Sequence, residues 1–487
     1  MNAPLISLEI SVVVLGLALL LAEFLVPAGR RKYLGYAAIA GLGALLLATF
    51  NCSGICPPFG TAFGGVFIND EFSLFFKRLF IVAAMLVTFI AVEFSDRFAP
   101  GNITEYFSLT LFALAGMLFA ASANDFVTLF VAIELITVTF YVLVSYQRNK
   151  TSSLEAGVKY LILGALSSAF MVYGIALVWG VTGKLDFVSL SALAPQFADN
   201  KMFLLGVLFI MAGLGFKITA FPFQIWAPDV YQGAPTPTTA FLAIGSKAAG
   251  FVLLLRVLFS AVPDLTQQSA TLLMIISGLT LLYGNLCALP QRNIKRLLGY
   301  SSIAHAGYLL LGIAALNVNG SAAILYYLMG YLFTVLAGFL VIAIVLRHLD
   351  AEDVAALAGL SRRSPLLAAT LTISMASLAG IPPLAGFFGK FLLLKSVVEA
   401  AQTTGHHGYY CLVFVALAGI VMSFYYYFGV VRAIYWGKET SEQPAIELSP
   451  AAKAAAWICL AGIFGLGLFP SPVLTLATQA AALLHVP

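Results

Sequence analysis

The chain has 487 residues, of which 61% are hydrophobic and only 9% are charged. An ordinary soluble domain is about 45 to 50% apolar and roughly 25% charged, so this composition excludes a soluble fold. The net charge of +4 gives no reason to expect a nucleic-acid ligand.

Apolar runs of about twenty residues, long enough to cross a bilayer as helices, recur along the whole sequence. A β-barrel is excluded because its strands would alternate polar and apolar residues in short segments. The predicted fold class is therefore all-α, a polytopic membrane protein of about 14 transmembrane helices. Spans 1 to 14 are predicted at residues 5–26, 33–50, 72–95, 105–122, 125–146, 154–180, 202–230, 236–260, 269–289, 296–316, 321–347, 365–398, 408–434 and 452–478.

Basic residues give the predicted orientation. They gather in the connections after odd-numbered spans, whereas the connections after even-numbered spans carry little beyond Lys184 and Lys201. The positive-inside rule makes the odd connections cytoplasmic, so both termini are predicted on the periplasmic side. The first span follows a nearly uncharged N-terminus without a cleavage site, and we interpret it as retained. A bacterial cytoplasmic membrane is the expected location.

The five cysteines predict no redox centre in this chain. They form no cluster that could ligate an iron-sulfur centre, and no CxxCH motif could hold haem. Cys52 and Cys56, in NCSGIC, form a disulfide only if their compartment is oxidising, and two unpaired thiols are an equal alternative.

Three charged residues fall near the middle of predicted spans, where a charge usually faces a bundle interior or a wet cavity. Glu134 lies nine residues, about 13 Å, along its helix from Asp125. Lys217 in span 7 and Lys247 in span 8 lie at comparable depth. We interpret these three as functional. Side chains nearer the span ends are interpreted as snorkelling to the interface, namely Lys77, Arg78 and Arg256.

Span 12 contains the sequence SLAGIPPLAGFFGKFLLLKSVVEA, in which Pro382 and Pro383 interrupt the helix before Lys390. Lys395 and Glu399 are four residues apart, which is the spacing of a local helical ion pair. Lys390 is therefore the functional candidate of this span, and Lys395 is interpreted as structural.

Three further residues are secondary candidates. His305 is central in span 10, where a lone histidine is as often a packing residue as a proton relay. Glu155 and Lys159 open span 6. They form either an ordinary surface pair or the mouth of a proton path from the cytoplasm, and the second interpretation is favoured because Lys159 points into a span otherwise without charge.

A five-helix unit is predicted to occur twice. Spans 7 and 12 both contain a proline break and a lysine, and the offset between them recurs elsewhere. Because five is odd, the second copy is inverted relative to the first. The offsets are 173 residues for Lys217 and Lys390, and 171 for Glu134 and His305 and for Tyr160 and Tyr331. The single membrane domain 1–487 then consists of helices 1–3 at 1–100, repeats at 105–260 and 269–434, and helix 14 at 452–478.

Proline breaks at membrane depth carry a physical requirement. Pro222 in span 7, like the two prolines of span 12, frees a backbone carbonyl, which is tolerated only when it is buried in protein or lines water. The breaks therefore predict hydrated cavities beside Lys217 and Lys390.

Three long motifs, GLGFKITAFPFQIWAPDVYQGAPTP, NIKRLLGYSSIAHAGYLLLG and SLAGIPPLAGFFGKF, resemble those of the antiporter-like subunits of respiratory complex I, the proton-translocating NADH:quinone oxidoreductase. The resemblance covers nearly the whole chain, and WAPDVYQGAPTP is similar to the N-type (chain 2) version of its motif.

This resemblance implies two proton half-channels joined at mid-membrane by ionisable residues and water. Glu134 matches the family's span 5 glutamate and Lys217 the span 7 lysine that pairs with it. Lys247 and Lys390 match the lysines of spans 8 and 12. Lys159 and Glu155 match polar positions near the inner entrance, and His305 lies on the connecting axis.

The resemblance also implies partners. These are further antiporter-like subunits, small membrane subunits, the lipid bilayer and transported protons, while FMN, iron-sulfur clusters and quinone belong to other subunits. The alternatives are a subunit of a multisubunit monovalent cation/proton antiporter or of a membrane-bound hydrogenase, and a purely structural membrane scaffold. The scaffold is disfavoured because it gives no reason to keep four central charges.

Overall fold

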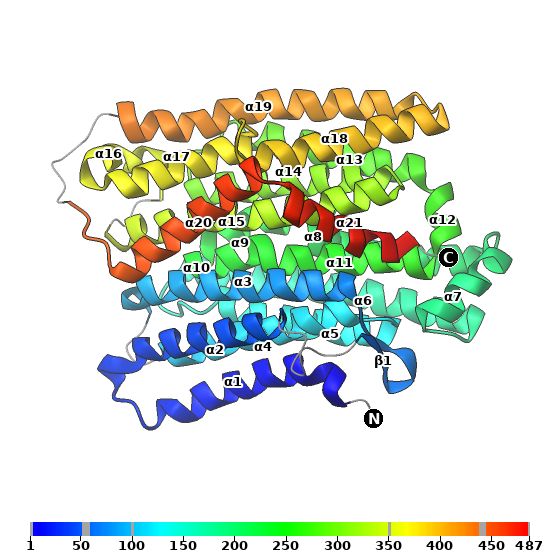
Figure 1. Cartoon of the computed structure of the whole chain (residues 1–487), viewed down its shortest axis with the longest axis horizontal. Helices are drawn as coiled ribbons and strands as arrows, with labels where there is room; N and C mark the ends of the chain where they lie inside the picture. Colours follow the sequence, from blue (N-terminus) through cyan, green and yellow to red (C-terminus); the bar gives the residue numbers. More distant parts are fainter. Residues whose placement is uncertain (1–2, 51–58, 99–101, 349–351, 438–444, 486–487) are drawn as a thin grey trace.

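The computed structural model describes residues 3–50, 59–98, 102–348, 352–437 and 445–485. Long helices lie side by side in one bundle, and η1 at the N-terminal side and η9 at the C-terminal side occupy the same end of it (Figure 1). Cys52 and Cys56 lie outside the described residues.

Among the described residues, 12 helices are long and apolar enough to cross a membrane. Ten match undivided predicted spans or most of one: α1 (Ser7–Glu23), α3 (Glu71–Glu93), α4 (Ile103–Ser122), α5 (Phe126–Val144), α6 (Thr151–Thr182), α13 (Ala270–Ala288), α14 (Ile294–Ala314), α15 (Val318–His348), α19 (Gly408–Trp436) and α20 (Pro450–Leu468). Predicted span 2 is α2 (Leu34–Ala48), a helix of 15 residues. The all-α polytopic fold is confirmed.

Both predicted helix breaks are present. Span 7 is divided into α8 (Lys201–Ile218) and α9 (Trp226–Gly233), and Pro222 lies in the connection. Span 12 is divided into α17 (Pro365–Ala379) and α18 (Ala385–Thr404), with both prolines between them.

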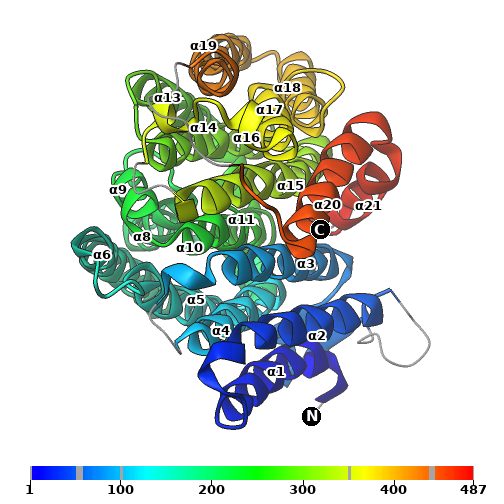
Figure 2. The same cartoon turned by 90° about the vertical axis from the view of Figure 1, so that its left-hand side faces the viewer.

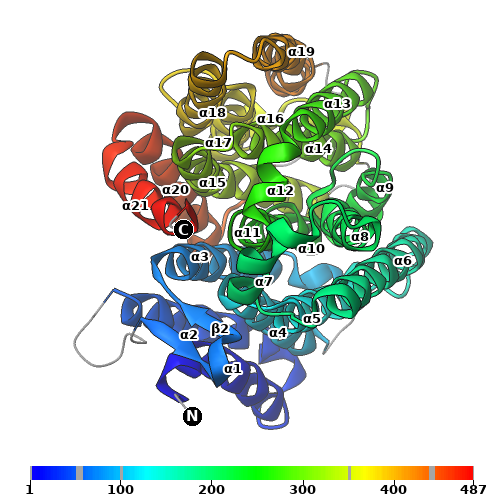
Figure 3. The same cartoon turned by 90° about the vertical axis from the view of Figure 1, so that its right-hand side faces the viewer.

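Span 8 is a continuous helix of mixed type, Thr236–Ala261. It begins as α10 (Thr236–Phe241), passes through a π-helical turn η6 (Leu242–Ser246), continues as α11 (Lys247–Arg256) and ends in a second π-helical turn η7 (Val257–Ala261). All of its most apolar window is buried, against 33% for the corresponding windows of α1, α6, α13 and α19. The helix that carries Lys247 is therefore central, and the end-on views place α11 inside the bundle (Figures 2 and 3).

Span 14 differs from the prediction. A single helix was expected over 452–478, but α20 ends at Leu468 and Pro470 separates it from α21 (Ser471–Ala482). Proline cannot continue a helix because it lacks the amide donor and clashes with the preceding turn. The separated α21 packs against α15 and α3 on the flank of the bundle (Figure 2).

Several short elements were not predicted, because they are too short to produce a periodic pattern. They are the antiparallel strands β1 (Gly60–Ala62) and β2 (Phe67–Asn69), the helices α7 (Phe187–Leu193), α12 (Pro263–Gln268) and α16 (Leu360–Arg363), and the 3-10 turns η1 (Ala3–Ile6), η2 (Ala28–Tyr33), η3 (Phe63–Gly65), η4 (Ser95–Arg97), η5 (Ala194–Phe197), η8 (Val354–Leu357) and η9 (Leu483–His485).

Polar contacts group the basic connections at one end of the bundle. Arg97, after span 3, donates to the carbonyl oxygens of Leu346 and Arg347, each at 2.9 Å. Lys295, after span 9, lies 2.9 Å from Glu352, which follows span 11. Connections after odd-numbered spans therefore share one face, opposite the end where η1 begins.

Candidate functional site

Lys217 is the second-last residue of α8, where the helix ends because Thr219 adopts a left-handed conformation with φ of 62°. The side chain is 5% exposed, and its ammonium donates to Thr137 Oγ1 of α5 at 2.5 Å. A buried ammonium is thus satisfied by a neutral hydroxyl.

The backbone groups freed at this break are bonded to protein. Trp226 Nε1 donates to the carbonyl of Phe216 at 3.0 Å, and the Phe221 amide donates to Thr280 Oγ1 at 3.0 Å. A cavity of about 560 Å³ borders the break, but apolar side chains such as Phe221 and Phe223 line it. The freed backbone groups are therefore bonded to protein and the cavity at the break is apolar, while the hydrated cavity expected beside Lys217 stays a prediction.

Glu134 does not pair directly with Lys217, which corrects the contact that was expected between them. The half-buried Glu134 carboxylate accepts a hydrogen bond from Ser168 Oγ of α6. Among the described residues no ion pair joins it to Lys217, because Thr137, one turn further along α5, holds the ammonium instead. The two charges still interact through the Coulomb attraction across that turn.

Lys247 is the first residue of α11, directly after the π-helical turn η6, and is 1% exposed. Its ammonium donates to both the side-chain oxygen and the carbonyl oxygen of Ser302 in α14. Single π-helical turns inside α-helices occur frequently at functional sites. No carboxylate contacts Lys247 among the described residues.

His305, 2% exposed on α14, lies in a chain of hydroxyl groups. One ring nitrogen contacts the hydroxyl of Tyr327 in α15, and the other lies 2.9 Å from the hydroxyl of Tyr427 in α19. Tyr427 in turn contacts Ser301, the neighbour of Ser302. These contacts place His305 in a group of hydrogen-bonded hydroxyls that extends to the residue next to Ser302, and its role as a proton relay stays a prediction.

Lys390 is 2% exposed and bonds to its own broken span. Its ammonium donates to the carbonyl oxygens of Leu378 and Ala379, the last residues of α17, at 2.7 and 3.1 Å. It also lies 4.8 Å from the ring centroid of Tyr308. The lysine thereby satisfies carbonyls that the break leaves free, a favourable place for a cation at a helix C-terminus.

Lys395 behaves as predicted. It is exposed and lies 3.6 Å from Glu399 in an i,i+4 ion pair. The two lysines of α18 therefore have different surroundings, since Lys390 is buried on backbone oxygens and Lys395 is solvated beside a carboxylate.

Lys159 forms the predicted local pair and a second ion pair, and its place at the entrance of a proton path stays a prediction. Its ammonium lies 2.7 Å from Glu155 in the local pair and 2.9 Å from Asp229 of α9. Asp229 also pairs with Arg296 of α14 at 2.5 Å. The cluster therefore joins the start of span 6 to the second half of span 7 at the end of the bundle that carries the basic connections.

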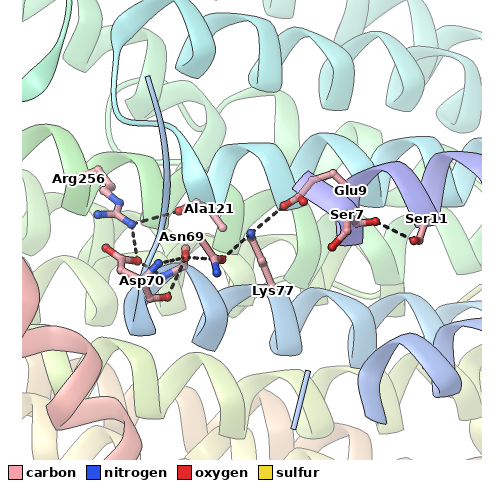
Figure 4. A network of polar contacts seen from close by, with 9 residues as sticks. Ser7, Glu9, Ser11, Asn69, Asp70, Lys77, Ala121 and Arg256 are labelled. Atoms are coloured by element: carbon pink, nitrogen blue, oxygen red, sulfur yellow. Dashed lines mark hydrogen bonds and ion pairs between the residues drawn. The ribbon is translucent and has the colours of Figure 1, made fainter. Parts of the chain in front are cut away.

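Two of the three side chains interpreted as snorkelling are instead buried in ion pairs. Lys77 is 0% exposed and lies 2.8 Å from Glu9 of α1. Arg256 is 4% exposed and lies 2.8 Å from Asp70, at the start of α3 (Figure 4). The prediction was wrong because the acidic partners are distant in sequence. Arg78 lies near the surface and donates to the Thr49 carbonyl at 2.6 Å.

The five ionisable residues Glu134, Lys217, Lys247, His305 and Lys390 are called the central line below. Sequence analysis missed the neutral side chains that contact them, which are Thr137, Ser168, Ser302, Tyr327 and Tyr427, and Ser301, which contacts Tyr427. The sequence contains one feature that could have indicated two of these groups. Ser301 and Ser302 precede His305 by four and three residues and so share its helix face.

Comparisons with known proteins agree on one family. The sequence profile described as NADH:quinone oxidoreductase/Mrp antiporter, TM matches residues 123–417. A curated relative, NADH-quinone oxidoreductase subunit N of Moorella thermoacetica, is 40% identical over 489 residues and covers 100% of both chains.

Two solved structures are similar over nearly the whole chain. A chain of respiratory complex I from Thermus thermophilus is 34% identical, with a TM-score of 0.79 and coverage of 97% of this chain and 99% of that one. A chain of the Mrp complex from Dietzia sp. DQ12-45-1b has a TM-score of 0.85, covers 100% of this chain and 98% of that one, and is 21% identical. At that identity the second likeness concerns the fold alone.

Proposed function

The chain belongs to the NADH:quinone oxidoreductase/Mrp antiporter transmembrane family, and we propose that it carries protons along the central line. It is a proton-translocating membrane-arm subunit of NADH:quinone oxidoreductase, of the N type, and so part of a translocase of the respiratory chain. Quinone reduction in other subunits drives it. The roles of individual residues are the proposal.

One observation carries the proposal, namely that Lys217, Lys247 and Lys390 are buried and that, among the described residues, their ammonium groups hydrogen bond to neutral oxygens and pair with no carboxylate. Burial disfavours the charged form of a lysine, whereas a bound carboxylate would favour it. Hydroxyl and carbonyl partners accept hydrogen bonds from the ammonium but do not favour its charged form as strongly as a carboxylate would. Such a lysine can release and regain a proton as its surroundings change, which arginine cannot do.

The order of transfer follows the contacts. Glu134 influences Lys217 through the Coulomb attraction, and a shorter separation would favour the charged lysine. Lys247 contacts Ser302, and the hydroxyl contacts that run from His305 through Tyr427 end at Ser301, the next residue along the same helix. His305 lies close enough to both Lys247 and Lys390 to feel their charges, so we place it between the two lysines in the order of transfer. Glu155 and Lys159 form the cytoplasmic entrance of the proton path.

The remaining expectations belong to the same proposal. Its setting is a bacterial cytoplasmic membrane, with the basic end of the bundle in the cytoplasm and the termini in the periplasm. Partner subunits of the membrane arm flank the chain, and FMN, iron-sulfur clusters and quinone are held by other subunits. Their copurification with this chain tests that assignment against a cation/proton antiporter.

Lys217→Arg tests the role of the central line most directly. The purified complex is reconstituted into vesicles, and NADH oxidation and vesicle acidification are measured together. Arginine keeps the positive charge but holds its proton, so we expect an assembled complex that no longer acidifies the vesicles. Lys217→Ala and Glu134→Gln should also lose coupled pumping. A normal ratio of protons to electrons in Lys217→Arg would disprove proton transfer through this residue.

A further inference from the structure

The segment α11 is bounded by π-helical turns on both sides, η6 before Lys247 and η7 after Arg256. Wider π-helical turns are places where helices bend. Lys247 is its first residue and Arg256 its last, so the only two charged residues of α11 stand at its two ends.

The two ends are held on opposite sides. Nine residues separate Lys247 from Arg256, which is two and a half turns of an α-helix, so their side chains point in opposite directions. Lys247 contacts Ser302 of α14. Arg256 contacts Asp70 at 2.8 Å and the carbonyl of Ala121 in α4 at 3.4 Å. Rotation of α11 about its axis would disrupt both attachments.

Asp70 is itself fixed in place (Figure 4). It caps α3 in a reciprocal arrangement with Ser73, accepting from the Ser73 amide at 2.7 Å while its own amide donates to Ser73 Oγ at 2.9 Å. The preceding residue, Asn69, accepts from Lys77 at 3.0 Å, and Lys77 pairs with Glu9 of α1. The carboxylate is therefore a rigid point to which α11 is attached.

Arg256 depends on that carboxylate. The guanidinium is buried, its Nε has no hydrogen-bond partner, and Asp70 is its only ion-pair partner among the described residues. A buried charge that loses its partner is strongly destabilised, so without Asp70 the guanidinium would have to move. Because Arg256 ends α11, that movement would reach Lys247.

We propose that Asp70 and Arg256 are positioning residues for Lys247, because their contact sets the rotation of α11 and so holds the Lys247 ammonium against Ser302. This inference rests on the proposed role of Lys247 in proton transfer. Neither residue belongs to the proton path itself.

The test uses the assembled complex in vesicles and two variants, Asp70→Asn and Arg256→Gln. Asparagine is as good a helix N-cap as aspartate, so Asp70→Asn keeps α3 capped and removes only the charge. We expect both variants to oxidise NADH normally and to pump roughly two- to thirtyfold fewer protons per electron, the range found for coupling residues that touch no ligand. Glu71→Gln, the adjacent exposed acid of the same turn, is the matched control and should pump normally.

Backbone amide hydrogen exchange separates positioning from general destabilisation. Exchange across residues 242–256 should accelerate in both variants and not in the control, while exchange in α5 and α14 stays unchanged. Arg256→Lys keeps the charge with a single donor group, so its pumping should lie between that of wild type and Arg256→Gln. Arg256→Lys therefore tests the contact with Asp70 through a smaller change than Arg256→Gln.

The outcomes distinguish the two proposals. If Arg256→Gln pumps and exchanges like the control, only the stranded charge in Asp70→Asn matters, and positioning is overturned. If Lys247→Ala abolishes pumping while both variants match the control, the inference fails and the proposed function stands. If Lys247→Ala itself pumps normally, the proposed function fails.

Discussion

Two sets of buried charges in this protein are satisfied in opposite ways. The central line contacts hydroxyl and carbonyl oxygens, as Lys247 does at Ser302. Glu9, Lys77, Asp70 and Arg256, which together with Asn69 are called the N-terminal ion-pair network, are held by opposite charges, as Lys77 is by Glu9. Lys217, Lys247 and Lys390 are buried about as deeply as Lys77 and Arg256, so the kind of partner separates these cations.

The difference has a functional consequence. A buried ion pair resists a change in either charge, because neutralising one partner strands the other in a medium that solvates it poorly. A lysine on neutral oxygens has no such partner to strand. We therefore expect residues of the N-terminal ion-pair network to keep their charge. On the proposed function, the lysines of the central line change theirs as protons pass.

The largest predicted effect lies in the central line. Lys247→Ala should reduce proton pumping by about a hundredfold or more, the usual loss when a proton-transferring group is removed. The folded complex should be retained, since Ser302 still has its Tyr231 contact at 3.0 Å. Vesicle acidification normalised to NADH oxidation measures the loss. Pumping at the wild-type level would show that contact with neutral oxygens does not identify a lysine that transfers protons.

The second effect concerns stability. Lys77→Met should leave the Glu9 carboxylate buried without a counter-charge and destabilise the protein by about 3 to 5 kcal/mol. Thermal denaturation of the purified complex measures this loss. Adding Glu9→Gln should restore part of the stability, because the stranded charge is removed. A double variant no more stable than Lys77→Met would mean that the packing of α1 against α4 and α2, and not the ion pair, holds α1 in place.

Sequence alone predicted the spans and both breaks because apolar runs and prolines within them are conspicuous. It found the central lysines for the same reason, since a charge inside an apolar run stands out. The neutral partners did not stand out, because serine, threonine and tyrosine are ordinary in membrane helices. Ser301 and Tyr427 are 126 residues apart, a pairing that no local pattern reveals.

The N-terminal ion-pair network shows the same limit. Lys77 was misinterpreted because its proximity to a span end fits snorkelling. Its partner Glu9 lies on a different helix, in a part of the chain with almost no other charge. Pairing depends on how α1 packs against α4 and α2 so that Glu9 reaches Lys77 of α3, which is a tertiary property.

A smaller effect tests the hydroxyl chain. Tyr427→Phe removes one hydroxyl between Ser301 and His305 and keeps the ring. Loss of one hydrogen bond contributes about 0.5 to 1.5 kcal/mol, so pumping should fall roughly two- to tenfold. Tyr425→Phe, on the exposed face of the same helix, is the control and should pump normally. Equal pumping by both variants would remove Tyr427 from the path.

The smallest effect compares two lysines of one helix. Lys395→Ala breaks an exposed i,i+4 pair with Glu399, so it should cost about 0.3 to 0.5 kcal/mol of stability and leave pumping unchanged. Lys390→Ala, five residues away, should abolish pumping, because its ammonium is buried on the carbonyl oxygens of the broken span. Both variants lose one charge from α18, so net charge cannot explain a difference between them. The opposite ranking would be a requirement for Lys395 and none for Lys390. It would show that a carboxylate partner does not fix a lysine in the charged state. The contrast between the two sets of charges would then have no functional meaning.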